Sequence, residues 1–458
     1  MATPKLPPAI VVGAHYDGFL QRALARFFER ATLETEAVPS PSSDGRLAIE
    51  PTEDPGALAV RWFGNRYVLR VPGQRPFTDH EVRFARAIGA VLAARYRAIL
   101  NPAQVVEREG LFRGAIEDRY VGSFFDSTPY SAKGDEGCAD RVADVIEILR
   151  VAALSSYENQ AISTGVLLLD TDEDPPGAFV TGDRLRPRYT GALTSIKSFF
   201  RLADGLRTVF LVARDGRVLD IVDVADWASR TGGSLALPAP CSAAYEAHAR
   251  STIGSRRTCV VLSPRHEIKV FADGTEVFAF RHADWHLLDL QAKYTQWWTA
   301  VGDLALAERL FRTALDLAEE RKGALFVVLR RPLASLAELV SAQDRLDMAL
   351  VDEAPDPDRP SRRNLLHLLA GRVVTELPRS VLAAMATLDG ATVTDRSGQL
   401  LAIGAILRHP PTEQADGTGL TEGARTTAAI TASRHGPVLK VSEDGMITFY
   451  DGGRIWDI

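Results

Sequence analysis

Apolar residues in this chain recur with two spacings, one typical of helices and one typical of strands. In the first hundred residues this pattern predicts a small α/β module, residues 1–104. Its predicted elements are a strand at 9–15, a helix at 19–31, strands at 57–65 and 66–73, and a helix at 77–100. Thr78 or Asp79 can cap the start of the last helix.

The end of this module, two strands followed by "FTDHEV" and a long helix, resembles the close of GAF-type sensor modules. An unrelated α/β cap is the alternative interpretation. The next stretch, up to about residue 137, contains many turn-forming residues and is expected to be loop and connector.

Residues 105–290 and 291–458 show the same order of predicted elements. Each begins with a helix and a strand, continues through two strands joined by a charged turn, and closes on a helix, a strand and a hairpin. The paired residues are Gly165 with Gly323, Gly216 with Gly398, Arg250 with Arg425, Ser263 with Ser442, and Asp273-Gly274 with Asp451-Gly452. We interpret this as a tandem duplication of one mixed β-sheet flanked by helices. The Pro-rich, charged segment 353–363 is expected to be a surface loop within the second copy.

Composition narrows the class of protein. Hydrophobic residues make up 46% and charged residues 24% of the chain, values ordinary for a globular protein. The net charge is -6 and the cations are scattered, which disfavours nucleic acid as a partner. The three cysteines have no metal-binding spacing, and no apolar run is long enough to span a membrane. We therefore expect a cytoplasmic protein without a membrane anchor or a DNA-binding tail.

The common phosphate-binding motifs are missing from the sequence, both the Walker-type loop and a strand-bounded G-x-G-x-x-G. His282 and His286 have the spacing of two zinc ligands on one helix face. There is no Glu beside the first histidine and no third ligand is evident, so a solvated or Trp-packed pair is the preferred interpretation over a zinc site.

Three short segments of the second copy suggest a nucleotide site. Asp389-Gly390-Ala391 places a carboxylate and two small residues at the start of a strand, where a ligand can approach the backbone. Gly423 to Thr427 predicts a helix start with an arginine and two hydroxyls, which suits a phosphate. Ser442-Glu443 follows a predicted strand and adds a hydroxyl and a carboxylate. An ordinary turn remains the alternative for Asp-Gly taken alone.

In their order, these segments resemble the diadenylate cyclase domain of the type found at the N-terminus of DisA. The matching residues are Gly323-Ala324-Leu325, Leu388-Asp389-Gly390-Ala391, Gly404-Ala405-Ile406-Leu407, Gly423-Ala424-Arg425-Thr426-Thr427 and Val441-Ser442-Glu443. The resemblance implies a domain that binds ATP with Mg²⁺ or Mn²⁺. Two such domains, face to face, join two ATP molecules into cyclic di-AMP and release pyrophosphate.

The same resemblance implies roles for individual residues. Asp389 and Arg425 are the implied catalytic residues, with Asp389 engaging a ribose hydroxyl or the metal and Arg425 holding phosphate. Asp389 and Glu443 are the implied metal ligands. The implied nucleotide-binding residues are Gly390, Ala391, Leu407, Gly423, Arg425, Thr426, Thr427 and Ser442.

The chain departs from the family at the phosphate motif, where Thr-Arg-His-Arg is replaced by Ala424-Arg425-Thr426-Thr427. The first copy departs further, because its Asp204-Gly205 is followed by leucine. We expect the first copy to be a degenerate partner lobe, so that two ATP-loaded sites require a homodimer through the second copy. Three hypotheses about the function stay open: a nucleotidyltransferase, a catalytically silent nucleotide-binding sensor, and a structural scaffold.

Overall fold

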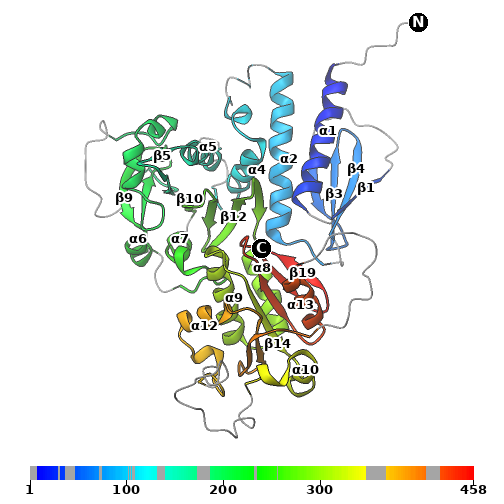
Figure 1. The fold of residues 1–458 in the computed structure, drawn as a ribbon. Coiled ribbons are helices and arrows are strands. Elements are labelled where there is room, and N and C mark those ends of the chain that lie inside the picture. Colours follow the sequence, from blue (N-terminus) through cyan, green and yellow to red (C-terminus); the bar gives the residue numbers. More distant parts are fainter. Residues whose placement is uncertain are drawn as a thin grey trace. The chain divides into compact units, whose positions relative to one another are not determined.

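The computed structural model describes most of the chain, and all structural statements below concern the described residues. These are residues 8–28, 31–36, 47–71, 75–101, 103, 105, 109–131, 140–172, 186–231, 235–254, 256–346, 368–408 and 423–458. The chain forms two compact units (Figure 1). Unit 1 comprises Met1–Leu237 and Ala247–Asp289, and unit 2 comprises Pro238–Glu246 and Leu290–Ile458. The predicted surface loop at 353–363 lies outside the described residues.

Unit 1 begins with an antiparallel sheet and two long helices. The strand order is β1 (Thr32–Glu36), β4 (Asn65–Arg70), β3 (Ala57–Trp62) and β2 (Ala48–Pro51), with α1 (Pro8–Phe27) and α2 (Asp79–Leu100). The strand predicted at 9–15 is wrong, because those residues belong to α1. A short apolar run fits either element, and here it continues into Tyr16, Leu20 and Leu24, which are buried at helical spacing.

The start of α2 follows the sequence prediction. The Thr78 side chain accepts a hydrogen bond from the Glu81 N–H, and the Glu81 carboxylate accepts one from the Thr78 N–H. This reciprocal arrangement is a capping box, which satisfies two of the amide groups at the helix start.

The connector predicted after residue 104 is partly wrong. Residues Ile116–Phe125 form helix α4, and its aromatic residues are buried in the core of unit 1. That core extends from the N-terminal sheet region into the following sheet, where Phe84 of α2 lies 4.9 Å, centroid to centroid, from Phe278 of β12. The predicted regions 1–104 and 105–290 therefore share one core.

The second sheet of unit 1 has seven strands. Their order is β13 (Asp284–Leu287), β12 (Thr275–Arg281), β11 (Ile268–Ala272), β10 (Thr258–Leu262), β7 (Thr164–Leu168), β8 (Thr208–Val212) and β9 (Val218–Asp223). Only β7 and β8 are parallel among these described strands. The accompanying elements are η2 (Glu109–Phe112), α5 (Arg141–Ala153), the β5 (Ser156–Tyr157) and β6 (Gln160–Ala161) hairpin, η5 (Gly191–Ser195), η6 (Lys197–Arg201), α6 (Val224–Thr231) and α7 (Glu246–Ser251).

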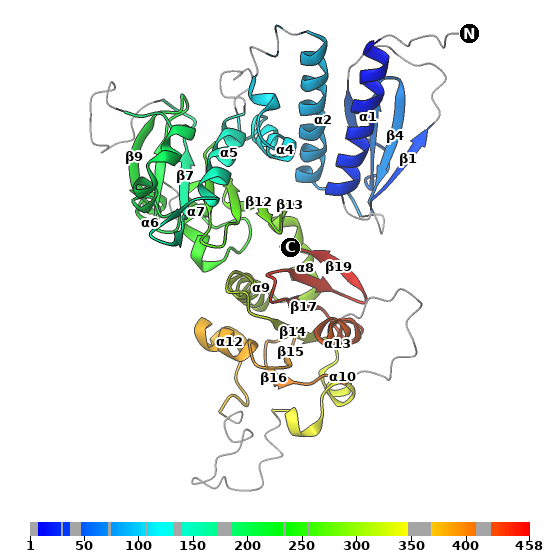
Figure 2. The same cartoon turned by 45° about the horizontal axis from the view of Figure 1, so that its top comes forward.

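Unit 2 contains one six-stranded sheet. Its order is β16 (Leu400–Ala405), β15 (Ala391–Asp395), β14 (Ala324–Leu329), β17 (Val438–Val441), β18 (Ile447–Tyr450) and β19 (Arg454–Asp457). The helical elements are η7 (Ala243–Tyr245), α8 (Leu290–Val301), α9 (Leu304–Glu319), α10 (Pro332–Leu339), η8 (Ala342–Asp344), η10 (Val374–Glu376), α12 (Arg379–Ala386) and α13 (Ala424–Ser433). Figure 2 shows α9 and α13 on opposite sides of this sheet.

The two larger sheets share their topology. In each sheet a central strand, β7 or β14, lies between a parallel neighbour, β8 or β15, and an antiparallel neighbour, β10 or β17. The parallel neighbour is followed by an antiparallel edge strand, and the antiparallel neighbour is followed by a hairpin. Both sheets are mixed and flanked by helices, so the predicted fold class is confirmed. Ser263 and Ser442 both follow the equivalent strand, and each donates its N–H to the carbonyl four residues later. Gly165 lies inside β7 whereas Gly323 precedes β14, so that pair is not equivalent, and duplication remains a prediction.

No helix among the described residues has the length and apolar character needed to cross a membrane.

Candidate functional site at one edge of the unit 2 sheet

Strand register brings the predicted site segments to one edge of the unit 2 sheet. Ala324 pairs with Val441 across the antiparallel β14 and β17, and Phe326 pairs with Thr392 across the parallel β14 and β15. The starts of β14 and β15 and the end of β17 therefore lie at the same edge. Ala391 also pairs with Ala405, which brings the end of β16 to this edge.

Arg425 contacts the other two charged residues that the sequence singles out, Asp389 and Glu443. Its Nη1 donates a hydrogen bond to Oε1 of Glu443 at 2.8 Å, and its Nη2 lies 3.9 Å from Oδ1 of Asp389. The Asp389 side chain is 98% exposed and that of Glu443 is 70% exposed. All three groups are thus accessible to a ligand, and the two exposed ion pairs contribute little to stability.

The space for Arg425 comes from a glycine. A Cβ atom at Gly323 would lie 2.2 Å from Nη1 and 2.7 Å from Cζ of Arg425, so the guanidinium covers the backbone at this position. From the sequence, Gly323 is notable only as the counterpart of Gly165 and as part of a segment that matches the family. Its contact with Arg425 depends on two segments that are about a hundred residues apart.

The turn before β15 also depends on a glycine. Gly390 has φ of +115°, and a Cβ there would lie 2.5 Å from the Gly404 carbonyl carbon and 2.6 Å from the Ala405 oxygen. The neighbouring Ala391 and Leu407, both predicted to line the nucleotide, are buried in the core with exposed fractions of 0% and 5%. Their side chains belong to the apolar core cluster of unit 2 that also contains residues of β14 and α13.

The predicted helix start is present at α13. Gly423 is its N-cap, and its carbonyl accepts hydrogen bonds from the N–H groups of Thr426 and Thr427. The first turn of a helix carries a partial positive charge, which favours an anion there. Thr426 and Thr427 are both partly exposed.

Lys440 is a cation that the sequence analysis missed. It lies on β17, and its Nζ donates a hydrogen bond to Oγ1 of Thr426 at 3.0 Å. A lysine at an alternating strand position carries no sequence signal of its own. Its place beside the phosphate segment follows from the packing of α13 on β17.

The donor set at this edge fits a hard divalent cation only in part. Asp389 and Glu443 supply two carboxylates, and Ser442, at the end of β17, is half-buried. Nowhere in the described chain do three or more His, Cys, Asp or Glu side chains form a group that could hold a metal. Mg²⁺ commonly binds one or two carboxylates together with substrate phosphates, and this edge offers that number.

The corresponding edge of unit 1 has different chemistry. Asp204 accepts hydrogen bonds from the N–H groups of Leu206, Arg207 and Thr208. Burial alone would raise the pKa of Asp204, but these backbone hydrogen bonds and the charge of Arg207 bring it below its ordinary value. Asp204 therefore stabilises its own turn, unlike the exposed Asp389.

Two further residues make this edge of unit 1 chemically different from that of unit 2. His248 is fully buried and donates from Nε2 to the Gly205 carbonyl at 2.8 Å, and burial lowers its pKa to about 4. Pro264 follows Ser263, where unit 2 has Glu443 after Ser442. The carboxylate at this turn position of unit 2 is thus missing from unit 1.

The histidine pair considered as zinc ligands lies in a hairpin. His282, with φ of +52°, is in the turn between β12 and β13, and His286 is on β13 opposite Ala279. The helix implied by their spacing is wrong, which removes the geometric reason for a shared metal.

No family model matches the chain. No curated protein matches it either. Among solved structures, a hypothetical membrane spanning protein from Bacillus cereus is 20% identical, covering 36% of this chain and 70% of that chain, with a TM-score of 0.26. A double mutant of DacA from Staphylococcus aureus is 15% identical, covering 33% of this chain and 85% of that chain, with a TM-score of 0.22. With TM-scores this low, the two similarities carry no inference about fold or function.

Proposed function

We propose that unit 2 binds ATP at this edge of its sheet and catalyses the condensation of two ATP molecules into cyclic di-AMP. The observation that carries the proposal is the meeting of Asp389, Arg425 and Glu443, which come from three segments of the motif resemblance. The protein's ligands in this proposal are ATP and Mg²⁺ or Mn²⁺, and we place it in the cytoplasm.

Each proposed role follows from the charge and position of the side chain. Arg425 binds phosphate oxygens and neutralises the charge that develops during transfer, as an arginine fork does well. Asp389 orients a ribose hydroxyl for attack on an α-phosphate. Asp389 and Glu443 hold the divalent ion, which supplies charge neutralisation when bound. Each 3′-hydroxyl attacks the α-phosphate of the other nucleotide, one P–O bond forms as another breaks, and pyrophosphate leaves.

Two nucleotides must face each other in this reaction, and unit 1 lacks the equivalent of Glu443. We therefore propose a homodimer through unit 2 as the productive state. The positioning of two bound reactants removes much of the entropic barrier of a bimolecular reaction.

A second function is favoured by a specific observation. Thr426 and Thr427 bring hydroxyls but no charge, and Arg425 already has a carboxylate partner in Glu443. Charge-assisted hydrogen bonds contribute roughly 1.5–3 kcal/mol each, so a site with fewer of them can bind a nucleotide without turnover. The alternative is a regulatory protein that binds ATP or a related nucleotide and is catalytically silent.

One experiment separates these functions. Purified protein is incubated with ATP and Mn²⁺ or Mg²⁺, cyclic di-AMP is measured by mass spectrometry, and nucleotide binding is measured by calorimetry. Product that disappears in Asp389→Asn supports the enzyme, whereas binding without product supports the silent protein. Absence of nucleotide binding would reject both.

A matched control is Glu376→Gln. Glu376 is an exposed carboxylate of unit 2 on η10, near the turn at the opposite end of β15 from Asp389. The Glu376→Gln variant should leave both product formation and ATP affinity unchanged. Equal losses in Glu376→Gln and Asp389→Asn would point to a general charge effect and not to a site at Asp389.

A further inference from the structure

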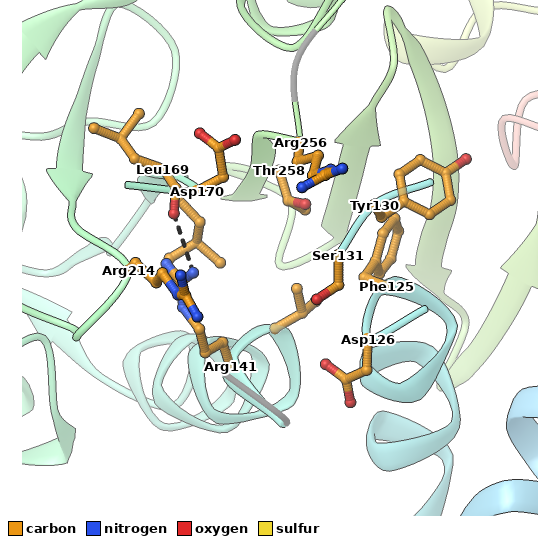
Figure 3. Close-up of a pocket in the computed structure, with 12 residues that line it drawn as sticks. Phe125, Asp126, Tyr130, Ser131, Arg141, Leu169, Asp170, Arg214, Arg256 and Thr258 are labelled. Atoms are coloured by element: carbon orange, nitrogen blue, oxygen red, sulfur yellow. Dashed lines mark hydrogen bonds between the residues drawn. The ribbon is translucent and has the colours of Figure 1, made fainter. Parts of the chain in front are cut away.

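Unit 1 contains a small polar cavity at the edge of its sheet where β7 ends. Its volume is about 100 Å³. The lining side chains come from α4 and the residues that follow it, the start of α5, the end of β7, the β8–β9 turn and the start of β10 (Figure 3). This is the opposite edge from Asp204 and Gly205, since those residues lie near the start of β7.

Three arginines from three separate segments line the cavity: Arg141, Arg214 and Arg256. Arg141 is fixed in place because Nη1 donates to the Leu169 carbonyl at 3.0 Å and Nη2 donates to the Ala213 carbonyl at 3.1 Å. Arg214 directly follows Ala213, so the backbone of Arg214 lies close to the Arg141 guanidinium. Three guanidinium groups at one cavity favour the binding of an anion there.

The start of α5 places backbone amide groups at the cavity, with the carboxylates of Asp140 and Asp144 at the N-cap and in the first turn. Asp140 is its N-cap, but its side chain accepts no capping hydrogen bond, and the next residue is Arg141. In unit 2 the corresponding helix α9 is capped by Asp303, whose side chain accepts from the Leu306 N–H at 2.8 Å, and the next residue is Leu304. The arginine and the uncapped helix start are thus specific to unit 1.

The carboxylates of the cavity wall do not fill it. Asp126 accepts a hydrogen bond from the Asp140 N–H at 3.1 Å. In Figure 3 the carboxylates of Asp126 and Asp170 point away from the space between Arg214 and Arg256. Among the lining residues there are three guanidinium groups and two carboxylates, and the hydroxyls of Ser131 and Thr258 also belong to the wall.

We propose that this cavity binds a phosphate group, as the free ion or as the head of a small phosphomonoester. A volume of 100 Å³ holds a few water molecules and is well below the roughly 300 Å³ at which pockets for drug-sized ligands begin. Arginine forks match the tetrahedral oxygens of phosphate, and the start of α5 contributes amide donors. This site is separate from the nucleotide site proposed in unit 2 and does not depend on it.

Calorimetric titration of the full chain with inorganic phosphate, at constant ionic strength kept with chloride, tests the proposal. Arg256 is exposed, so Arg256→Gln should leave the fold intact. We expect saturable phosphate binding in the wild type and a loss of affinity of about fivefold to tenfold in Arg256→Gln. Arg214→Gln should have a similar effect. Absence of binding in the wild type, or unchanged affinity in both variants, would overturn the site.

Matched controls place the binding in unit 1. Arg265→Gln changes an exposed arginine on the turn before β11 and should not alter phosphate affinity. Arg425→Gln reports separately whether unit 2 contributes to the phosphate signal. A loss of phosphate binding in Arg425→Gln with none in Arg256→Gln would assign the phosphate to unit 2 and overturn the proposal.

A parallel titration with glycerol phosphate separates the two sources of the group. Binding of inorganic phosphate alone identifies a site for the free ion. Comparable affinity for glycerol phosphate, lost in Arg256→Gln, identifies the head group of a phosphomonoester. A failure of unit 2 to bind ATP or form cyclic di-AMP has no effect on either result.

Discussion

The guanidinium of Arg425 occupies the space that a side chain at position 323 would fill, with Nη1 2.2 Å from the position of a Cβ on Gly323. The arginine is held there by Glu443 and approached by Asp389. Gly323 thus determines where the only charged residue retained from the family's phosphate motif can lie.

Gly323→Ala should weaken nucleotide binding with little effect on stability. The atoms that a Cβ would meet belong to the far end of the Arg425 side chain, which can move at small cost. We expect ATP affinity to fall by about tenfold, as for the loss of one charge-assisted hydrogen bond, with stability within about 1 kcal/mol of wild type. Calorimetry with ATP and urea unfolding measure the two effects. A large stability loss would show that Arg425 cannot move.

Gly390→Ala should instead destabilise unit 2. The φ of +115° is unfavourable for alanine, and the Cβ would meet backbone atoms of Gly404 and Ala405 that cannot move without shifting the β15–β16 pair. We expect a loss of about 2–4 kcal/mol in the free energy of unfolding. Gly453→Ala is the matched control, because a Cβ there meets no atom within 4 Å. Equal stability of the two variants would contradict this account of the turn.

His248 should make unit 1 sensitive to mild acid. Burial lowers its pKa to about 4 in the folded state, against about 6.5 in an unfolded chain, so the unfolded state binds more protons between these values. Stability should therefore fall as the pH is lowered from 6.5 towards 4, by on the order of 3 kcal/mol. Urea unfolding at several pH values measures this.

His248→Gln is the companion variant for the pH series. It keeps a donor for the Gly205 carbonyl but does not titrate, so its stability should change less over the same pH range. A slope as steep as that of the wild type would show that other groups cause the pH dependence.

Thr427→Arg, alone or with Thr426→His, should strengthen nucleotide binding. The change restores charge in the first turn of α13, close to Arg425 and Lys440. We expect at least about a tenfold gain in ATP affinity or in product formation, from one added charge-assisted hydrogen bond. Thr431→Arg, one turn farther along α13, is the control and should give a smaller gain. Equal gains in both variants would indicate general charge attraction.

Local patterns in the sequence determined much of this protein. The helices at 79–100 and 304–319 follow from apolar spacing and from the caps directly before them, Thr78 and Asp303. The Asp-Gly turn before β15 and the helix start after Gly423 were also predicted, because they depend on the conformations of adjacent residues. The order of elements in the two larger sheets was sufficient to predict mixed sheets flanked by helices.

Long-range packing decided the rest. The run at 9–15 is helical and α4 is buried because both pack on one core that joins distant segments. No local pattern in the sequence predicts this packing. The Gly323–Arg425 contact, the place of Lys440 beside Thr426, and the arginine-lined cavity each combine residues far apart in the chain. Strand register and helix docking set such distances, and the sequence specifies them only through the whole fold.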